Sequence, residues 1–570
     1  MKTAIKIISL LALLACSQVP LAPLGPGEVK KQHEAVGEKF MISTQGIYST
    51  DAGTKMFELG GNAIDAAAAI SFVLGVERPQ STGIGGGGFL LYGSPKYKTP
   101  ITVDFREKAP FKAHAKMYLD KNGVEIKGKS FHGIFSVGVP GLVKGIVEVH
   151  KKYGKLKLAT VLQPAIELAE SGFPVYGELV FGLKWKEKEL AKYPATRKIF
   201  YKEGRLLKEG ELLVQKDLAK TLREIAKKGS RGFYRGWVAK AIVKENRRLG
   251  GLIRSKDLRR YNVKYRKPVR GEYRGHSIFS MSPPSSGGIH IIQILNTVEK
   301  DQLRKYGVLS PEAIHLTASA MQAAFSDRAK YLGDSDFVRV PVTALTSKKY
   351  ADSIRAKISM DKARPRQDVI PGKKLPYESN ETTHFSVADS EGNIVVSTQT
   401  LNGPLGSGVV VPGTGIILNN EMDDFSTKPG AINIYGAVGG QKNLVEPEKR
   451  PLSSMSPTIV YKDGRPLLAL GSPNGTRILT CVAQTILNYL EFGLPLYESV
   501  AAVRFHHQWT PDEIRLEEVG LPKKTMQSLR DKGHKLRLKN WHCKVQAVAF
   551  ESGKLHGVSD PRGQGKSFGK

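Results

Sequence analysis

The apolar positions in the first part of the chain recur mainly at helical spacing. Between residues 44 and 331, several segments return an apolar residue every three or four positions, which is the period of an amphipathic helix. Two of these segments have alanine-rich faces, which indicates helices that are mostly buried. The predicted helices span residues 44–60, 62–76, 142–152, 158–171, 217–228, 237–249, 289–298 and 311–331.

Strand-like patterns interrupt this helical part and dominate after residue 382. Residues 383–389 and 394–400 form two apolar runs around a three-residue loop that ends in glycine, as a hairpin does. In this register Thr382 faces Thr400, whereas a shift by one residue would place it opposite Leu401. The other predicted strands are residues 89–92, 101–105, 416–419, 458–461 and 467–470, with a half-exposed hairpin over 263–281.

A glycine-rich stretch formally matches a dinucleotide-binding motif, because Gly83, Gly85 and Gly88 have the required spacing. That motif needs a strand before it and a helix after it. Here a predicted helix precedes the glycines and a predicted strand follows them, so the nucleotide hypothesis is rejected. The glycines are expected instead to let backbone segments approach one another closely.

A strand, a glycine-containing turn and a helix follow one another over residues 467–490. Such a turn presents free backbone N–H groups, which are the donors of an oxyanion hole. On its own the pattern favours a structural tight turn over an oxyanion hole.

The N-terminus has the pattern of an export signal. Lysines at positions 2 and 6 precede a short apolar run that ends before Cys16, too short for a membrane span. The sequence Leu13-Leu14-Ala15-Cys16 resembles a bacterial lipobox, which predicts a lipid on Cys16; an ordinary signal with a chance cysteine is the alternative. We therefore expect a signal peptide over residues 1–15 and a linker over residues 16–40.

Charge and cysteine content narrow the class of protein. The 570 residues include 86 Lys and Arg against 53 Asp and Glu, a net charge of +33. A charge of this size is typical of proteins that bind nucleic acid or an anionic membrane surface, and also of basic cell-envelope proteins. The basic residues are scattered, and no nucleic-acid-binding motif accompanies them, so we expect a basic cell-envelope protein without a nucleic-acid partner. Apart from Cys16 only Cys481 and Cys543 remain, which allows one disulfide at most.

Thr382 is the candidate nucleophile. A threonine hydroxyl needs a base to remove its proton, and the α-amine of an N-terminal threonine can serve as that base. This chemistry requires a chain cut between Glu381 and Thr382. The polar, charged segment over residues 335–378 reads as exposed, which suits a cut nearby.

Several motifs are distributed over almost the whole chain after the signal. They are Asp104-Phe105-Arg106-Glu107, Thr382-Thr383-His384-Phe385-Ser386, Thr400-Leu401-Asn402, residues 420–426, residues 450–457 and Ser559-Asp560-Pro561-Arg562. Each motif alone is weak; an arginine beside carboxylates, as at Arg106, would by itself be interpreted as a surface ion pair. Taken together the motifs are specific, and they resemble those of the bacterial γ-glutamyltranspeptidase family.

The resemblance implies an N-terminal-nucleophile hydrolase of the α+β class with a four-layer αββα sandwich. Residues 41–381 would form a large subunit and residues 382–570 a small catalytic subunit, interlocked as a heterodimer after self-cleavage. The resemblance also implies a role for each matching residue. Thr382 would be the nucleophile, with Thr400 bonded to it and Asn402 holding substrate; Arg106, Ser453 and Ser454 would bind the α-carboxylate, Glu421 and Asp424 the α-ammonium; Asn474 and Gly475 would form the oxyanion hole, and Tyr435 would gate a lid over residues 431–449.

The implied activity is γ-glutamyl transfer and hydrolysis. Glutathione is the expected donor, and water, amino acids or dipeptides are the expected acceptors, with no metal or organic cofactor. Two enzymatic alternatives use the same nucleophile, namely a cephalosporin acylase and a poly-γ-glutamate transferase. A third alternative is an uncut, inactive envelope-binding homologue. Export predicts a location in the periplasm or, with lipid, at the outer membrane.

Overall fold

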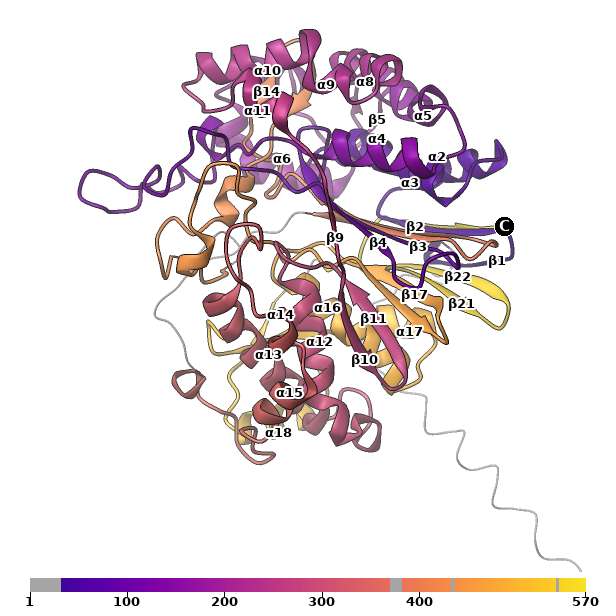
Figure 1. The fold of residues 1–570 in the computed structure, drawn as a ribbon, viewed down its shortest axis with the longest axis vertical. Helices are drawn as coiled ribbons and strands as arrows, with labels where there is room; N and C mark the ends of the chain where they lie inside the picture. The colour runs from indigo at the N-terminus through magenta and orange to yellow at the C-terminus, as the bar shows by residue number, and fades with distance from the viewer. Residues whose placement is uncertain (1–31, 370–381, 432–435, 540–542) are drawn as a thin grey trace, which may run out of the picture.

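Two seven-stranded antiparallel sheets lie face to face at the centre of the computed structural model (Figure 1), which describes residues 32–369, 382–431, 436–539 and 543–570. The first sheet has the order β23 (Lys566–Gly569), β2 (Phe40–Thr44), β12 (Thr383–Asp389), β13 (Ile394–Thr400), β3 (Gly87–Gly93), β4 (Ile101–Asp104), β9 (Lys264–Arg266). The second has the order β1 (Glu34–Gly37), β22 (Lys554–Ser559), β21 (Gln546–Glu551), β17 (Arg465–Gly471), β16 (Thr458–Lys462), β11 (His276–Ser280), β10 (Val269–Tyr273).

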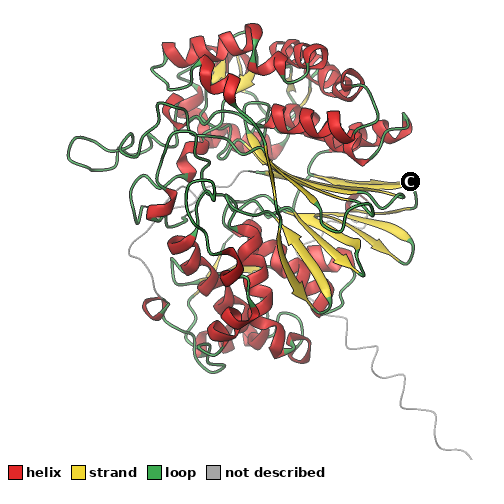
Figure 2. Cartoon of the chain, in the orientation of Figure 1, coloured by secondary structure: helices red, strands yellow, loops and turns green. Residues whose placement is uncertain are grey.

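Helices cover the outer face of each sheet, so the layers run helix, sheet, sheet, helix (Figure 2). The first sheet is covered by α2 (Ile47–Glu58), α3 (Ala63–Glu77), α4 (Leu142–Tyr153), α5 (Leu158–Ser171), α6 (Gly177–Leu190), α7 (Pro194–Phe200), α8 (Lys216–Lys228), α9 (Arg231–Tyr234), α10 (Gly236–Arg248) and α11 (Ser255–Arg260). The second is covered by α12 (Gly287–Val298), α13 (Pro311–Tyr331), α14 (Val342–Leu345), α15 (Lys348–Arg355), α16 (Arg477–Ile486), α17 (Leu496–Ala501) and α18 (Lys523–Asp531). The predicted αββα sandwich is confirmed.

Short strands complete the described structure outside the two large sheets. They pair as β5 (Phe173–Pro174) with β8 (Leu212–Leu213), β6 (Tyr201–Lys202) with β7 (Arg205–Leu206), β14 (Val410–Val411) with β15 (Ile416–Ile417), and β18 (Phe505–His506) with β19 (Ile514–Leu516) and β20 (Leu536–Leu538).

Local sequence explains why α3 starts where it does. The Asn62 side chain accepts hydrogen bonds from the N–H groups of Ile64 and Asp65, and the Asp65 carboxylate accepts one from the Asn62 N–H. This reciprocal cap satisfies backbone donors that the first helical turn leaves open. Every residue of α3 is buried, which accounts for its alanine-rich composition.

Both large sheets mix strands from before and after the predicted cut. In the first sheet β2 lies between β23 and β12, and β13 pairs with β3; in the second, β1 pairs with β22 and β11 with β16. Backbone hydrogen bonds therefore join the two parts of the chain at many places, independently of the peptide bond between them.

The structure corrects two details of the sequence-based expectations. The stretch predicted as linker up to residue 40 contains β1 and the start of β2, because Glu34–Gly37 pairs with β22 and forms an edge of the second sheet. The helix predicted from residue 44 begins at Ile47, because residues 40–44 pair with β12 and β23. The predicted signal peptide and Cys16 lie outside the described residues.

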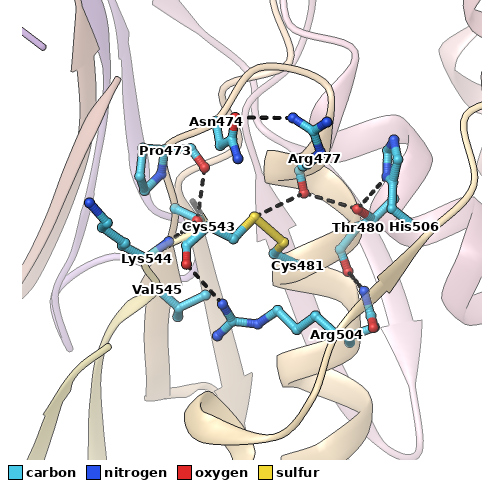
Figure 3. The surroundings of a disulfide bond; sticks show 12 residues. Pro473, Asn474, Arg477, Thr480, Cys481, Arg504, His506, Cys543, Lys544 and Val545 are labelled. Carbon is cyan, nitrogen blue, oxygen red and sulfur yellow. Dashed lines mark hydrogen bonds between the residues drawn. A yellow bond between two sulfur atoms is a disulfide. The ribbon is translucent and has the colours of Figure 1, made fainter. Parts of the chain in front are cut away.

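A disulfide joins Cys481 to Cys543 and thereby ties α16 to the chain just before β21 (Figure 3). The Arg504 guanidinium donates to the Cys543 carbonyl at 3.1 Å, and the Lys544 N–H donates to Ser472 Oγ at 3.2 Å. The disulfide therefore helps to hold the turn at residues 471–476 in place. Both cysteines follow the predicted cut, so this bond does not link the two parts of the chain.

Candidate active site

One pocket opens at the end of the sheets where β12 begins and β13 ends. Segments that are far apart in the sequence meet there. Its lining includes most of the residues that the sequence assigned to a site, together with one arginine that the sequence did not single out. The lining residues are Arg106, Arg328, Thr382, Thr400, Asn402, Glu421, Asp424, Ser453, Ser454, Met455, Gly475, Thr476 and Ile478.

The two threonines lie side by side, as the hairpin register predicts. Thr383 pairs with Gln399, so the residues just beyond this pair, Thr382 and Thr400, face each other. Their Oγ1 atoms are 3.4 Å apart, and Thr400 Oγ1 also accepts a hydrogen bond from the Asn402 N–H at 2.8 Å. Either hydroxyl can be the donor in the contact between the two threonines, since each has one proton to donate and two lone pairs that accept.

Glycine at residue 86 is required by the close approach of β13. A Cβ atom on Gly86 would lie 2.0 Å from the Thr400 carbonyl oxygen. The expectation that this glycine-rich stretch serves close backbone contact is therefore confirmed, and the contact fixes the end of the strand that carries Thr400.

Arg106 follows β4 and is 1% exposed, so the alternative of a surface ion pair is wrong. Its two terminal nitrogens pair with the carboxylates of Glu421 and Asp424, and its Nε donates to the Pro451 carbonyl at 3.3 Å. The residues predicted to bind the two charges of a zwitterionic head are thus paired with one another in the structure. These pairs keep the pKa of Arg106 above its ordinary value despite burial.

Two buried carboxyl groups lie next to this arginine. Burial raises the pKa of Glu107 to about 7, and burial also raises the pKa of Glu421 well above its ordinary value; in both cases the Arg106 charge opposes the shift. The Glu107 carboxyl interacts with the neighbouring carboxyl of Glu421 and with the charge of Arg106. The negative charge in the site therefore depends on pH near neutrality.

Glu107→Gln should raise the free energy of unfolding more at pH 8 than at pH 5. A folded-state pKa near 7, against 4.5 for the ordinary group, means that the stability contributed by the protonated carboxyl is present below pH 4.5 and lost as the pH rises through 7. The glutamine amide does not titrate, so the variant does not lose stability in this way as the pH rises. Between pH 5 and pH 8 the stability of the variant relative to wild type should therefore increase by on the order of 1–3 kcal/mol. Thermal unfolding of variant and wild type at both pH values measures it. A stability difference that is the same at both would contradict the shifted pKa.

Ser453 and Ser454 are held by the turn that precedes α12. The Ser453 N–H donates to the Pro284 carbonyl, and the Ser453 carbonyl accepts from the N–H and Oγ of Ser286, each at 2.8 Å. Gly287 packs against Ser456, where a Cβ atom would lie 2.5 Å from the serine Cβ. Residues from before the predicted cut therefore position the serines that follow it.

The turn at residues 471–476, where the sequence predicts an oxyanion hole, has an unusual backbone conformation. Asn474 and Gly475 have φ values of 102° and 53°, in the region that L residues rarely adopt. Neither of their backbone N–H groups donates to an acceptor within the described parts of the chain. Gly475 lines the pocket, whereas Asn474 is not among the lining residues and its Oδ1 accepts from Arg477 at 3.3 Å (Figure 3).

Three groups that shape the site were missed by the sequence analysis. Asn443 donates to the Asp424 carbonyl at 2.7 Å and accepts from the Leu452 N–H at 3.0 Å, so it joins two site segments. Glu107 was seen only as part of a motif, and Arg328 of α13 received no role. Arg328 lies near the end of α13, and no local signal in the sequence distinguishes it from another arginine at a helix end. Tyr435 and Glu381 lie outside the described residues.

A family profile described as Gamma-glutamyltranspeptidase matches residues 49–569. The chain belongs to the γ-glutamyltranspeptidase family. The glutathione hydrolase proenzyme of Escherichia coli K12 is 45% identical over 569 residues, covering 98% of each chain. These matches fit the arrangement of the pocket, whose residues come from the motifs that carry the family resemblance.

Solved structures with the same architecture include members of this family and an acylase. A chain of Helicobacter pylori γ-glutamyltranspeptidase is 46% identical with a TM-score of 0.56, covering 59% of this chain and 96% of that one. The cephalosporin acylase of Bacillus halodurans is 27% identical with a TM-score of 0.84, covering 97% of this chain and 99% of that one. Likeness to both means that the fold alone does not choose the substrate.

Proposed function

We propose that this member of the γ-glutamyltranspeptidase family hydrolyses glutathione and transfers its γ-glutamyl group to amino acids or dipeptides. The observation that carries the proposal is the pocket in which the Thr382–Thr400 pair lies beside Arg106, Asp424 and the two serines. The 45% sequence identity with a glutathione hydrolase proenzyme, over 98% of each chain, supports the same activity.

The reaction proceeds in two steps through an ester. The Oγ of Thr382 attacks the γ-carbonyl carbon while the α-amine of the same residue, freed by chain cleavage, takes the hydroxyl proton. The backbone N–H groups of Asn474 and Gly475 hold the oxyanion, and the leaving amine departs with the proton as cysteinylglycine. Water or an acceptor amine then attacks the ester and releases Thr382.

The charged cluster around Arg106 recognises the glutamyl head. A free α-amino acid carries one carboxylate and one ammonium, and the cluster offers a guanidinium and carboxylates at the same place. Arg106, Ser453 and Ser454 are assigned to the α-carboxylate, and Asp424 and Glu421 to the α-ammonium. Asn402 holds the substrate beside the nucleophile, and Tyr435, outside the described residues, is assigned to the lid.

Maturation cuts the chain between Glu381 and Thr382 and leaves a heterodimer. Strands from both sides of the cut pair with one another within each large sheet, which supports subunits that stay together after cleavage. Thr382 thus acts first on its own peptide bond and then on γ-glutamyl amides.

The acylase alternative rests on the fold shared with a cephalosporin acylase. The retained set of Arg106, Asp424, Ser453 and Ser454 in the pocket favours a free glutamyl head instead. The uncut envelope-binding homologue lacks any comparable support.

Export completes the proposal. Among the helices of the described residues none is both long and apolar enough to cross a membrane. We place the protein in the periplasm because of its N-terminal signal. The alternative is a lipid on Cys16, which would tether the protein to the outer membrane. Mass spectrometry of the N-terminal peptide from membrane and soluble fractions distinguishes the two.

Two assays on the purified protein test this function. Gel electrophoresis should show two chains, and glutathione should be converted to glutamate and cysteinylglycine. The kcat/KM for a γ-glutamyl anilide should exceed that for the glutaryl anilide, which lacks the α-ammonium, by about 100-fold. A persistent single chain without activity would overturn the enzyme proposal, and a preference for the glutaryl anilide would favour the acylase.

A further inference from the structure

A second cavity lies in the helical layer that covers the first sheet, and its lining shares no residue with the pocket around Thr382. Residues of α4, α9 and α11 and the residue before α10 surround it (Figure 1). Half of its eight lining residues are basic and none is acidic. The basic residues are Lys144, Arg231, Arg235 and Arg259.

The three arginines of this lining have no partner of opposite charge. No hydrogen bond or ion pair joins the guanidinium of Arg231, Arg235 or Arg259 to another residue within the described parts of the chain. All three residues are exposed, so an ion in solution can reach them. Lys144 differs from them, because it pairs with Glu148 one turn further along α4, at 3.1 Å.

Other arginines in this layer do have carboxylate partners. Arg223 of α8 pairs with Glu170 through both terminal nitrogens, and Arg248 at the end of α10 donates to Glu245 at 2.6 and 2.8 Å. Like charges around one cavity repel one another unless an anion balances them. Since the lining supplies no carboxylate, the balancing anion has to come from outside the chain.

Neutral donors at the same cavity suit an anion as well. The hydroxyl of Ser230, a lining residue, forms no hydrogen bond with any residue that the structure describes. Helix α10 begins directly after Arg235, with no side-chain cap and no acidic residue in its first turn. The N–H groups of residues 236–238 donate to no acceptor in the described structure, and such a helix start attracts anions.

Two buried tyrosines give the cavity a fixed inner wall. The rings of Tyr234 and Tyr261 are stacked, with centroids 5.7 Å apart and an angle of 12° between their planes. The Tyr234 hydroxyl donates to the Pro140 carbonyl at 2.9 Å, and the Tyr261 hydroxyl donates to the Arg106 carbonyl at 2.8 Å. The arginines therefore surround a wall that is held in place by the core.

We propose that this cavity binds a phosphate group. Guanidinium groups match the geometry of phosphate oxygens through paired hydrogen bonds, and the Ser230 hydroxyl and the start of α10 add further donors. A doubly charged anion fits three unpaired arginines better than a single carboxylate does. Free inorganic phosphate and the phosphate of a lipid headgroup share this chemistry. The site is independent of the proposed γ-glutamyl activity.

Binding to the mature protein tests the site with two probes. Isothermal titration calorimetry measures inorganic phosphate, and co-sedimentation measures phosphatidylcholine vesicles with and without phosphatidic acid. In the pocket variant Arg231→Gln/Arg235→Gln/Arg259→Gln, binding should weaken at least about tenfold, as expected when charged hydrogen bonds are lost. The kcat on a γ-glutamyl anilide should stay at the wild-type value and shows that this variant is folded.

A matched variant controls for net charge. Lys240→Gln/Lys244→Gln/Arg247→Gln removes the same three charges from exposed positions of α10 that do not line the cavity. Its binding should change by no more than about twofold at physiological ionic strength, since salt screens distant surface charges.

A single substitution tests the site independently of the arginines. Ser230→Asp places a carboxylate beside them and should also abolish binding; it carries the test if the pocket variant does not fold. Binding of inorganic phosphate would identify the free ion as a ligand, and binding confined to vesicles with phosphatidic acid would identify a lipid headgroup. Wild type that binds neither probe, or equal losses in the pocket and control variants, would refute the site.

Discussion

Thr382→Ala is expected to leave the chain uncut and inactive. The hydroxyl that attacks the peptide bond before residue 382 is the same one that attacks the γ-glutamyl carbonyl, and alanine removes it from both reactions. We expect a single chain near the 62.4 kDa of the whole sequence and a loss of kcat on the order of 10⁴-fold or more, as for other nucleophile deletions. Gel electrophoresis and the anilide assay measure the two effects on one sample.

The neighbouring threonine provides the matched control. Thr383 is equally buried, and its hydroxyl donates to Gln45 at 3.0 Å, outside the pocket lining. Thr383→Ala should still be cut and active, and Thr382→Ser should retain both reactions at reduced rate. Normal cleavage of Thr382→Ala would place the nucleophile elsewhere.

Arg106→Gln is expected to have the second largest effect. Removing the guanidinium leaves two or more carboxyl groups buried without a counter-charge, which costs about 3–5 kcal/mol of stability when one partner of a buried pair is lost. The substitution also removes the group that holds the other residues of the glutamyl-head site in place. The kcat/KM for a γ-glutamyl anilide should therefore fall about 10³-fold. Denaturant unfolding and steady-state kinetics measure these losses separately.

Arg266→Gln is the control that separates the loss of stability from the loss of activity. This arginine is also buried in ion pairs, with Asp104 at 2.7 Å and Asp334 at 3.5 Å, but it does not line the pocket. It should lower stability while KM stays near the wild-type value. If Arg106→Gln behaves in the same way as Arg266→Gln, Arg106 is structural only.

The nucleophile region could be predicted because its geometry is local. Only a short loop separates the strand that follows Thr382 from the strand that ends at Thr400. The glycine at the end of this loop sets the register of the two strands. Most long helices were also predicted, since their apolar faces repeat regularly. Helix α6 was not, because Phe181 and Trp185 are 55% and 41% exposed and blur its apolar face.

The rest of the site could not be predicted from pattern because it depends on contacts across the whole chain. Arg106 pairs with carboxylates 315 and 318 residues away, and motif resemblance alone brought them together. Arg328 meets Ser454 across 126 residues, and no local signal distinguishes it from an arginine at a helix end. The charge states of Glu107 and Glu421 arise from burial, which periodicity does not quantify. Residues 34–40 looked like a linker because an edge strand this short has too few positions to show alternation.

Mass spectrometry of the enzyme stopped by acid during turnover tests the central claim most directly. With L-γ-glutamyl-p-nitroanilide as substrate, the smaller chain should begin at Thr382 and carry one added γ-glutamyl group on that residue. The added group should disappear once the substrate is exhausted. A new N-terminus at another residue, or a γ-glutamyl group attached elsewhere while Thr382 stays unmodified, would contradict the account.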